Sequence, residues 1–201
     1  LRALARLWQA DEEAGVLEHI AAKLGADVRF FLRGGTALGL GRGDAIFPLS
    51  DPPPAWVVIA RPSFGVSTAD AYRWFDEQAG GLKPRAARGP HAARHLTPEA
   101  QSLKPVSPFP AWPVPPTEWR NDLQRPVVAK HPRIGVLVRQ TSNEGAFYAA
   151  MSGSGSAVFG LFDDASRARS AASALSGRGV TTWVTRTLSG RGARHAMRLR
   201  L

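Results

Sequence analysis

The sequence contains no cysteine in its 201 residues. This absence excludes disulfides and metal sites built on thiolates. No run of apolar residues is long enough to cross a bilayer, and the first residues lack the pattern of a signal peptide. Acidic residues are few, with 16 Asp and Glu against 26 Lys and Arg, so the formal net charge is +10. From these absences we expect a globular cytoplasmic protein.

The excess of positive charge has two interpretations. It could neutralise the phosphates of a nucleic acid, or it could belong to a basic enzyme that handles phosphorylated ligands. The densest basic stretches, 83–95 and 186–200, do not alternate with aromatic residues as a nucleic-acid surface would. We therefore favour the enzyme and expect neither a nucleic acid nor a membrane as a partner.

Hydrophobic spacing divides the first 78 residues into helices and strands. The turn-like "GRGD" separates two apolar stretches, and Ser67 followed by Asp70 has the pattern of a helix start. The predicted elements are a helix over 1–9, a helix from an Asp11 cap to Gly25, a hairpin over 36–50, a strand over 55–62 and a helix over 67–78.

The second half of the chain repeats the mixture without a long βαβ alternation. Its predicted elements are a helix around 119–129, a helix from Pro132, strands over 146–151 and 157–162, a helix capped by Asp163 or Asp164, and a strand over 180–188. The order helix, strand, strand, helix, strand indicates an α+β fold with an antiparallel sheet.

Between the halves, residues 80–116 are rich in proline and glycine. Proline at this density is incompatible with a helix or a central strand, so we expect a long surface excursion. His91 and His95 have helical i, i+4 spacing, but no dense acidic cluster stands near them to complete a metal site. We therefore expect a solvated loop here and no protein-built metal site.

One charged residue stands in unusual surroundings. Asp27 lies between a helical stretch and two phenylalanines, Phe30 and Phe31. It could bond to backbone N–H groups at a helix end, or it could act as a base that takes a proton from a hydroxyl nucleophile. Composition alone leaves both alternatives open.

Two further stretches have a structural and a functional interpretation each. The "SGSGS" stretch at 152–156 lies between apolar strands, so it could be a tight hairpin turn or a loop whose N–H groups approach a phosphate. Tyr72 lies one turn into a helix that follows a buried strand. It could pack in the core or stack on a nucleobase.

Together these stretches resemble a known family. The motifs "GADVRFFLRGGTALGLGRGD" (25–44), "ARPSFGVSTADAY" (60–72), "NDL" (121–123) and "MSGSGSAVFGLF" (151–162) follow one another with the order and spacing found in the GHMP kinase superfamily. The likeness is to the branch that phosphorylates 4-diphosphocytidyl-2-C-methyl-D-erythritol. It covers nearly the whole chain apart from the proline-rich insert, and the combination of motifs is specific although no single motif is.

The resemblance implies a reaction. That branch transfers the γ-phosphoryl group of ATP, which binds with Mg²⁺, to the 2-hydroxyl of a cytidine-diphosphate-linked methylerythritol in the non-mevalonate route to isoprenoids. The aspartate of the family's "GADVP" motif is the catalytic base and corresponds to Asp27. The implied partners are therefore this small-molecule substrate and ATP.

The resemblance also implies substrate-binding residues. The aromatic residue after the family's "VST" segment stacks on cytosine and corresponds to Tyr72, with Thr68 in the same segment. The family's glycine–serine loop lines the nucleotide and substrate cleft and corresponds to Gly153, Ser154 and Gly155.

The sequence departs from the family pattern at two places. Arg29 stands where the family usually has proline, and a cation so near Asp27 favours the carboxylate form. The chain also begins in helical rhythm, and the family's ATP-phosphate loop, lysine and substrate histidine are not found. We therefore expect the 201-residue chain alone to be inactive. The alternatives are another small-molecule GHMP kinase, such as one for homoserine or mevalonate derivatives, and a truncated non-catalytic copy.

The resemblance finally predicts the domain organisation. We expect residues 1–60 to be the C-terminal part of the family's N-terminal domain. Residues 61–201 would then be its C-terminal domain, with an antiparallel sheet, helices and the insert at 80–116.

Overall fold

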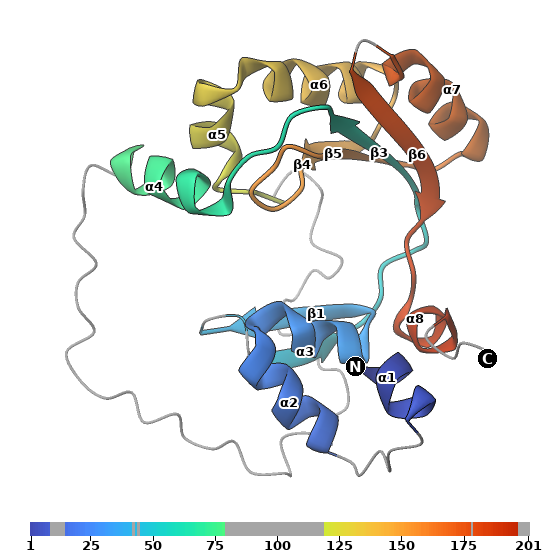
Figure 1. The fold of residues 1–201 in the computed structure, drawn as a ribbon. Helices are drawn as coiled ribbons and strands as arrows, with labels where there is room; N and C mark the ends of the chain where they lie inside the picture. Colours follow the sequence, from blue (N-terminus) through green and yellow to red (C-terminus); the bar gives the residue numbers. More distant parts are fainter. Residues whose placement is uncertain (9–14, 42, 44, 79–118, 178, 197–201) are drawn as a thin grey trace. The chain divides into compact units, whose positions relative to one another are not determined.

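The chain forms two compact units in the computed structural model of Figure 1. The structure describes residues 1–8, 15–41, 43, 45–78, 119–177 and 179–196. Among them, unit 1 takes the residues up to 54 and those from 188 onward, and unit 2 takes those from 55 to 187. Unit 1 is therefore built from both ends of the chain. The family domain boundary expected at residue 60 stays a prediction.

Unit 1 combines short helices with one β-hairpin. Its elements are helices α1 (Arg2–Leu7), α2 (Val16–Leu24), α3 (Ala26–Arg33) and α8 (Gly190–Ala196), and strands β1 (Thr36–Leu40) and β2 (Ala45–Leu49). The two strands pair antiparallel with Leu38 opposite Phe47, which confirms the predicted hairpin. Helix α2 ends at Gly25, as predicted, and the Asp11 cap lies outside the described residues.

The apolar spacing did not predict helices α3 and α8. Helix α3 has only eight residues between two glycines, which is too short for a helical period to stand out. Helix α8 contains Gly190 and Gly192, and glycine has a low helix propensity. Its first turn is held from outside the helix backbone, because the Ser189 hydroxyl accepts the N–H of Gly192 at 3.1 Å.

Asp51 joins the hairpin to helix α8 within unit 1. One carboxylate oxygen accepts the N–H and the hydroxyl of Thr36 at 2.9 and 3.1 Å, and the other accepts the N–H of Gly190 at 2.7 Å. The backbones meet so closely that a Cβ on Gly35 would lie 2.8 Å from the Gly190 Cα. Asp51 therefore fixes a contact between residues that are 139 positions apart.

Unit 2 is built on a four-stranded sheet in the order β4–β5–β3–β6. Its strands are β3 (Trp56–Pro62), β4 (Tyr148–Met151), β5 (Val158–Phe162) and β6 (Val180–Arg186). All neighbouring strands pair antiparallel, with Ile59 facing Phe159 on one side and Trp183 on the other. The predicted antiparallel sheet is confirmed.

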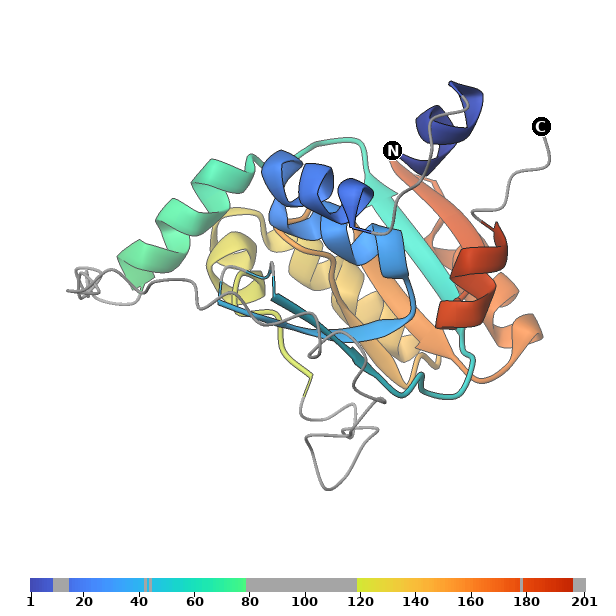
Figure 2. The ribbon, with the colours of Figure 1, turned by 90° about the horizontal axis from the view of Figure 1, so that it is seen from below.

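Two helices cover one face of this sheet. The helices of unit 2 are α4 (Thr68–Gln78), α5 (Gln124–Lys130), α6 (Pro132–Asn143) and α7 (Ala165–Leu175). Helix α6 contacts β4 and β5, and α7 contacts β3 and β6, so both lie on the same side of the sheet (Figures 1 and 2). The predicted order helix, strand, strand, helix, strand is confirmed from α6 to β6.

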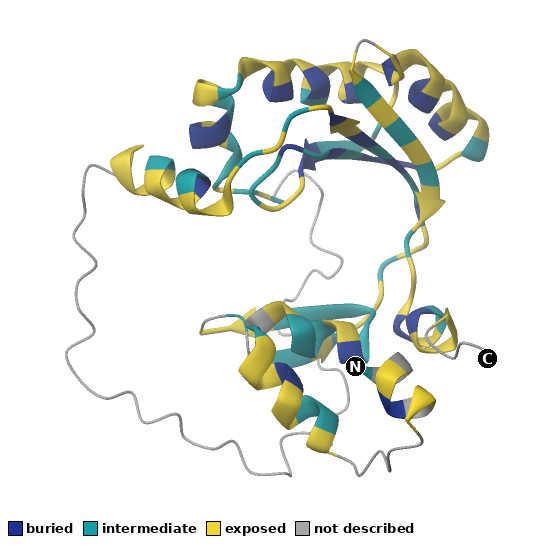
Figure 3. Ribbon diagram, in the orientation of Figure 1, coloured by how far each residue is buried: buried dark blue, intermediate teal, exposed yellow. Residues whose placement is uncertain are grey.

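The hydrophobic core lies between these helices and the sheet. Buried residues recur on the inner faces of α6 and α7, and half-buried residues alternate with exposed ones along β6 (Figure 3). The largest fully buried apolar side chains are Phe162, Ile134, Met151, Val58, Val127 and Val158. At Gly160 a Cβ would clash with the Thr141 side chain, so β5 approaches α6 as closely as glycine allows.

Helix starts in unit 2 follow local chemistry. The Asp164 carboxylate accepts the N–H groups of Ser166 and Arg167 at 2.8 and 2.9 Å, so Asp164 rather than Asp163 caps α7. The predicted helix over 119–129 is wrong at its start, because the Asn121 side chain accepts the Leu123 N–H in a turn that precedes α5. The proline-rich stretch, with His91 and His95, lies outside the described residues.

Candidate active site

The glycine–serine stretch forms the turn between β4 and β5. The Ser152 N–H donates to the Ala157 carbonyl at 2.8 Å, and the Gly155 N–H donates to the Ser152 carbonyl at 2.9 Å. Gly153 and Gly155 have positive φ angles of 53° and 91°, which glycine adopts at little cost. The hairpin interpretation is thus confirmed, and the strand residues next to the turn, Met151 and Val158, are buried.

Lack of space for a side chain explains the glycine at position 155 but not the one at position 153. A Cβ on Gly155 would lie 2.8 Å from the Met151 sulfur, whereas a Cβ on Gly153 would meet no atom within 4 Å. Gly153 and Ser154 stand at the open side of the turn. Among the described residues, no acceptor takes their backbone N–H groups. Such N–H groups at a turn can bind an anion.

Asn121 clamps this turn from outside. Its side-chain amide donates to the carbonyls of Met151 and Gly153 at 2.8 and 2.9 Å. Gln124 adds a third contact, because its side-chain oxygen accepts the Met151 N–H at 2.7 Å. The sequence contained this signal as the "NDL" stretch, but it was assigned no structural role there.

The start of helix α4 meets the turn from the other side. The hydroxyls of Thr68 and Ser154 lie 3.0 Å apart and form a hydrogen bond. The Ser156 hydroxyl donates to the carbonyl of Phe64, in the segment that leads from β3 into α4. The structure thus brings together two of the predicted substrate-binding residues, Thr68 and Ser154.

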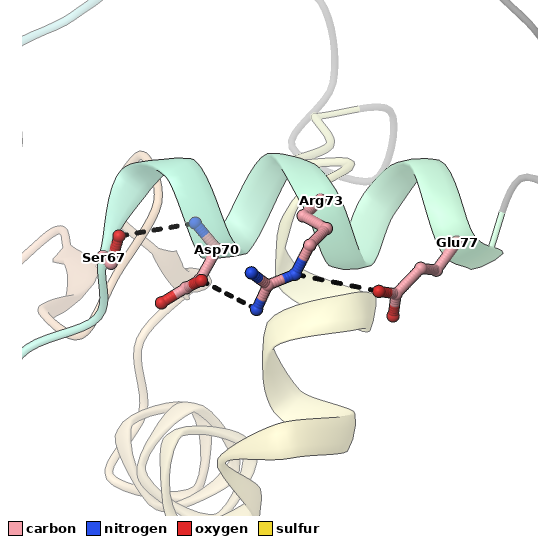
Figure 4. Close-up of polar contacts among 4 residues, drawn as sticks. All are labelled: Ser67, Asp70, Arg73 and Glu77. Atoms are coloured by element: carbon pink, nitrogen blue, oxygen red, sulfur yellow. Dashed lines mark hydrogen bonds and ion pairs between the residues drawn. The ribbon is translucent and has the colours of Figure 1, made fainter.

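Helix α4 is stabilised locally at its exposed surface. The Ser67 hydroxyl accepts the N–H of Asp70 at 3.4 Å, which agrees with the predicted helix start (Figure 4). Arg73 pairs with Asp70 at 2.7 Å and with Glu77 at 3.7 Å along the same face. The Arg73 side chain is 61% exposed, so these pairs contribute little to stability.

Tyr72 does not pack in the core, because it is 56% exposed. It lines a hollow of about 530 Å³ together with Phe75, Asn121, Met151 and Gly153. An exposed ring beside polar backbone groups can stack on a flat aromatic ligand. Four of the predicted residues therefore belong to one region of unit 2, and Gly155 shapes its turn.

Asp27 lies in unit 1, in the first turn of helix α3, and is exposed. No side chain caps this helix at Gly25, and within the described part of the chain nothing hydrogen-bonds the Asp27 carboxylate. A carboxylate in a first helical turn is favoured by the helix dipole. Arg29, two residues further along the helix, is partly exposed and has an interaction of its own. That Asp27 faces the glycine–serine turn stays a prediction.

The described residues contain no group of three or more His, Asp or Glu that could hold a metal ion. They also contain no helix long and apolar enough to cross a membrane. The hollow beside the turn is lined by aromatic, amide and backbone groups and by the charged residues Arg120 and Asp122.

Comparison with known proteins adds a family to this geometry. The family model described as "GHMP kinases C terminal" matches residues 117–181, which include the clamp, the turn and helix α6. The 4-diphosphocytidyl-2-C-methyl-D-erythritol kinase of Geobacillus kaustophilus is 34% identical over 98% of this chain and 62% of its own length. That of Deinococcus radiodurans is 37% identical over 92% of this chain and 56% of its own length.

Solved structures agree with the sequence relatives. A crystal structure of 4-(cytidine 5'-diphospho)-2C-methyl-D-erythritol kinase matches with a TM-score of 0.64 and 30% identity, over 92% of this chain and 60% of that one. A homoserine kinase from Cytophaga hutchinsonii, at 18% identity, shares the fold, with a TM-score of 0.51 over 81% of this chain and 50% of that one. The chain thus spans about three fifths of the length of the relatives it matches.

Proposed function

Because the chain belongs to the GHMP kinases and is similar to their 4-diphosphocytidyl-2-C-methyl-D-erythritol kinases, we propose that it is part of such a kinase. The proposed reaction transfers the γ-phosphoryl group of ATP to the 2-hydroxyl of 4-diphosphocytidyl-2-C-methyl-D-erythritol, on the route to isoprenoid precursors. The observation that carries the proposal is identity of 34–37% over 92–98% of this chain.

We propose Asp27 as the base of this reaction. As the hydroxyl oxygen attacks the γ-phosphorus, its proton passes to the Asp27 carboxylate while the bond to the leaving ADP breaks. The carboxylate is exposed and unbonded among the described residues, so it is available to a hydroxyl. Mg²⁺ would come with the phosphates of ATP and would supply charge neutralisation there.

The substrate side of the site belongs to unit 2. Tyr72 would stack on the cytosine ring, with Thr68 beside it. The open N–H groups of Gly153 and Ser154 would donate to a phosphate oxygen at the turn. Gly155 lets the turn keep this shape above Met151. These roles need no movement within the turn, because Asn121 already holds it.

The test is phosphoryl transfer by the chain joined to the N-terminal segment of the Geobacillus kaustophilus relative. The joined protein is expected to consume ATP only when the cytidine substrate is present. Asp27→Asn should lower kcat by about 10²–10⁴-fold, because the hydroxyl then loses its proton acceptor. Mass spectrometry of the product checks which hydroxyl carries the phosphate.

Asp76→Asn is the matched control, since Asp76 is an exposed acid on helix α4. It should leave turnover unchanged. Full turnover by the Asp27→Asn variant would show that Asp27 is not the base. If the joined protein turned over homoserine and not the cytidine substrate, the proposed substrate would be wrong. We expect the 201-residue chain alone to show no turnover. We also expect the enzyme to be cytoplasmic.

A further inference from the structure

A second hollow, of about 760 Å³, lies on the α5–α6 side of unit 2. Val128, Gly135 and Val138 belong to its lining on these helices, and Trp119 and Tyr148 supply aromatic rings. Its size is that of a small-molecule site. Tyr72 does not line it, but the two hollows adjoin and share six lining residues, Phe75, Arg120, Asn121, Asp122, Tyr148 and Ala150. Arg125 and Arg139 line the larger hollow and not the one beside Tyr72.

Three guanidinium groups face this hollow, from Arg120, Arg125 and Arg139, against a single carboxylate, Asp122. None of these four residues forms an ion pair with a described residue. Other arginines of unit 2 have partners, because Arg73 pairs with acids and Arg61, Arg169 and Arg186 lie over tryptophan rings. Uncompensated positive charge inside a concave surface attracts anions.

The scaffold places two of these arginines on packed helices. A Cβ on Gly135 would lie 2.7 Å from Val128 Cγ1, so α5 and α6 approach each other closely there. The same Cβ would lie 3.6 Å from the Arg139 Nη1. The Arg139 guanidinium therefore lies over Gly135, one turn back along α6, and Arg125 comes from the first turn of α5.

Tyr148 adds a neutral donor beside these cations. Its ring contacts that of Trp119 edge to face, with the centroids 4.9 Å apart. Burial raises the pKa of the Tyr148 hydroxyl above its ordinary value, so the group keeps its proton at neutral pH. A protonated hydroxyl beside guanidinium groups matches the oxygens of a phosphate.

We propose that this hollow binds a phosphate or diphosphate group, held by Arg125 and Arg139 with Arg120 at its margin. The ligand chemistry is a compact polyanion, either inorganic or carried by an organic phosphate. The inference does not depend on the proposed kinase function, because it uses neither Asp27 nor Tyr72.

The probe is inorganic pyrophosphate, titrated into the 201-residue chain by calorimetry. The double variant Arg125→Gln, Arg139→Gln should bind at least about tenfold more weakly, because two charge-assisted contacts are lost. Both side chains are exposed, so the thermal unfolding midpoint should not change. Arg73→Gln is the matched control and should bind pyrophosphate as the parent chain does.

Two further arms locate the site and the source of the anion. Lys130→Gln should leave pyrophosphate binding unchanged, since Lys130 is a cation of α5 that does not line the hollow. Cytidine diphosphate titrated into Tyr72→Ala should still bind if organic diphosphates enter the arginine hollow. No binding of pyrophosphate, or equal binding by the double variant, overturns the proposal. Loss of pyrophosphate binding in Arg73→Gln also overturns it.

Discussion

At the scale of single residues, Asn121 shows how one amide can hold a functional turn. Its Nδ2 donates to the carbonyls of Met151 and Gly153 in the glycine–serine turn. Its Oδ1 accepts the N–H of Leu123 in the segment that precedes α5. Only an amide of this length offers both donors and an acceptor. The sequence-based prediction assigned Asn121 no structural role, yet Asn121 holds the glycine–serine turn at 152–156, which that prediction did identify.

We expect Asn121→Asp to lower the free energy of unfolding of unit 2 by about 1–3 kcal/mol, because an oxygen then replaces the donor that faces two carbonyls. Urea unfolding followed by circular dichroism measures the loss. Asp122→Asn is the neighbouring control and should change little, since Asp122 is exposed. Equal midpoints for both variants would show that the amide does not clamp the turn.

Asp164 predicts a pH dependence. Backbone hydrogen bonds, first that from Arg167, hold the pKa of this carboxyl below its usual value. Its folded pKa is the lower one, so its contribution to stability is present above about pH 4 and is lost as the pH falls through the folded pKa. Asp164→Ala should therefore lower the urea midpoint at pH 6, and the difference from the parent chain should shrink toward pH 3.

Asp163→Ala serves as the control for this helix cap, since Asp163 is the adjacent acid. It should leave the midpoint unchanged at both values of pH. A difference between Asp164→Ala and the parent chain that is constant from pH 6 to pH 3 would contradict the assignment of the cap.

At the scale of elements, Gly160 lets strand β5 approach helix α6 closely. Gly160→Ala should lower the free energy of unfolding by about 1–3 kcal/mol, because the added methyl group meets the Thr141 side chain. Thr141→Ser removes the γ-methyl group and keeps the hydroxyl that donates to the Leu137 carbonyl at 2.8 Å.

The double variant Gly160→Ala, Thr141→Ser should therefore recover part of the stability. Recovery is partial, because the same methyl group would also lie 3.1 Å from Phe162. Thermal unfolding of the four proteins of this cycle gives the coupling between the two sites. Additive losses would show that Gly160 and Thr141 do not compete for the same space.

The elements that the sequence predicted are those with a long apolar period or a clear boundary. Strand β3, helix α6 with Pro132 at its start and the glycine–serine hairpin have such signals. Helix α8 was missed because it contains two glycines and because the N–H of its first residue, Gly190, is satisfied by Asp51, 139 residues earlier, a partner that no local pattern records. The hollow that contains Arg125 and Arg139 was also missed, because its lining residues come from separate elements that meet only in the folded structure.

At the scale of the whole molecule, the hydrophobic core belongs to unit 2. The buried core cluster lies entirely between residues 58 and 175. In unit 1 the described buried residues are mainly small, such as Ala5, Ala21 and Ala193, and Leu24 and Phe31 are more than 60% exposed. We therefore expect unit 2 to fold without unit 1.

Residues 55–187 produced alone should show one cooperative thermal transition and strand signals by circular dichroism. Their two ends already pair, because the Ala55 N–H donates to the Thr187 hydroxyl and the Thr187 N–H donates to the Ala55 carbonyl, both at 3.0 Å. Residues 1–54 produced alone are the control and should show no cooperative transition. An unfolded 55–187 fragment would contradict a self-sufficient unit 2.

The Asp51–Gly190 hydrogen bond has a consequence for biosynthesis. A ribosome synthesises Asp51 139 residues before Gly190, so the two partners can meet only after all of the intervening chain has been made. Throughout that interval, Asp51 can accept the hydrogen bonds from Thr36 in the hairpin, but the N–H of Gly190 is not yet present. During that time chaperones have access to it, and a premature stop codon ahead of residue 190 would leave nascent chains without this closure.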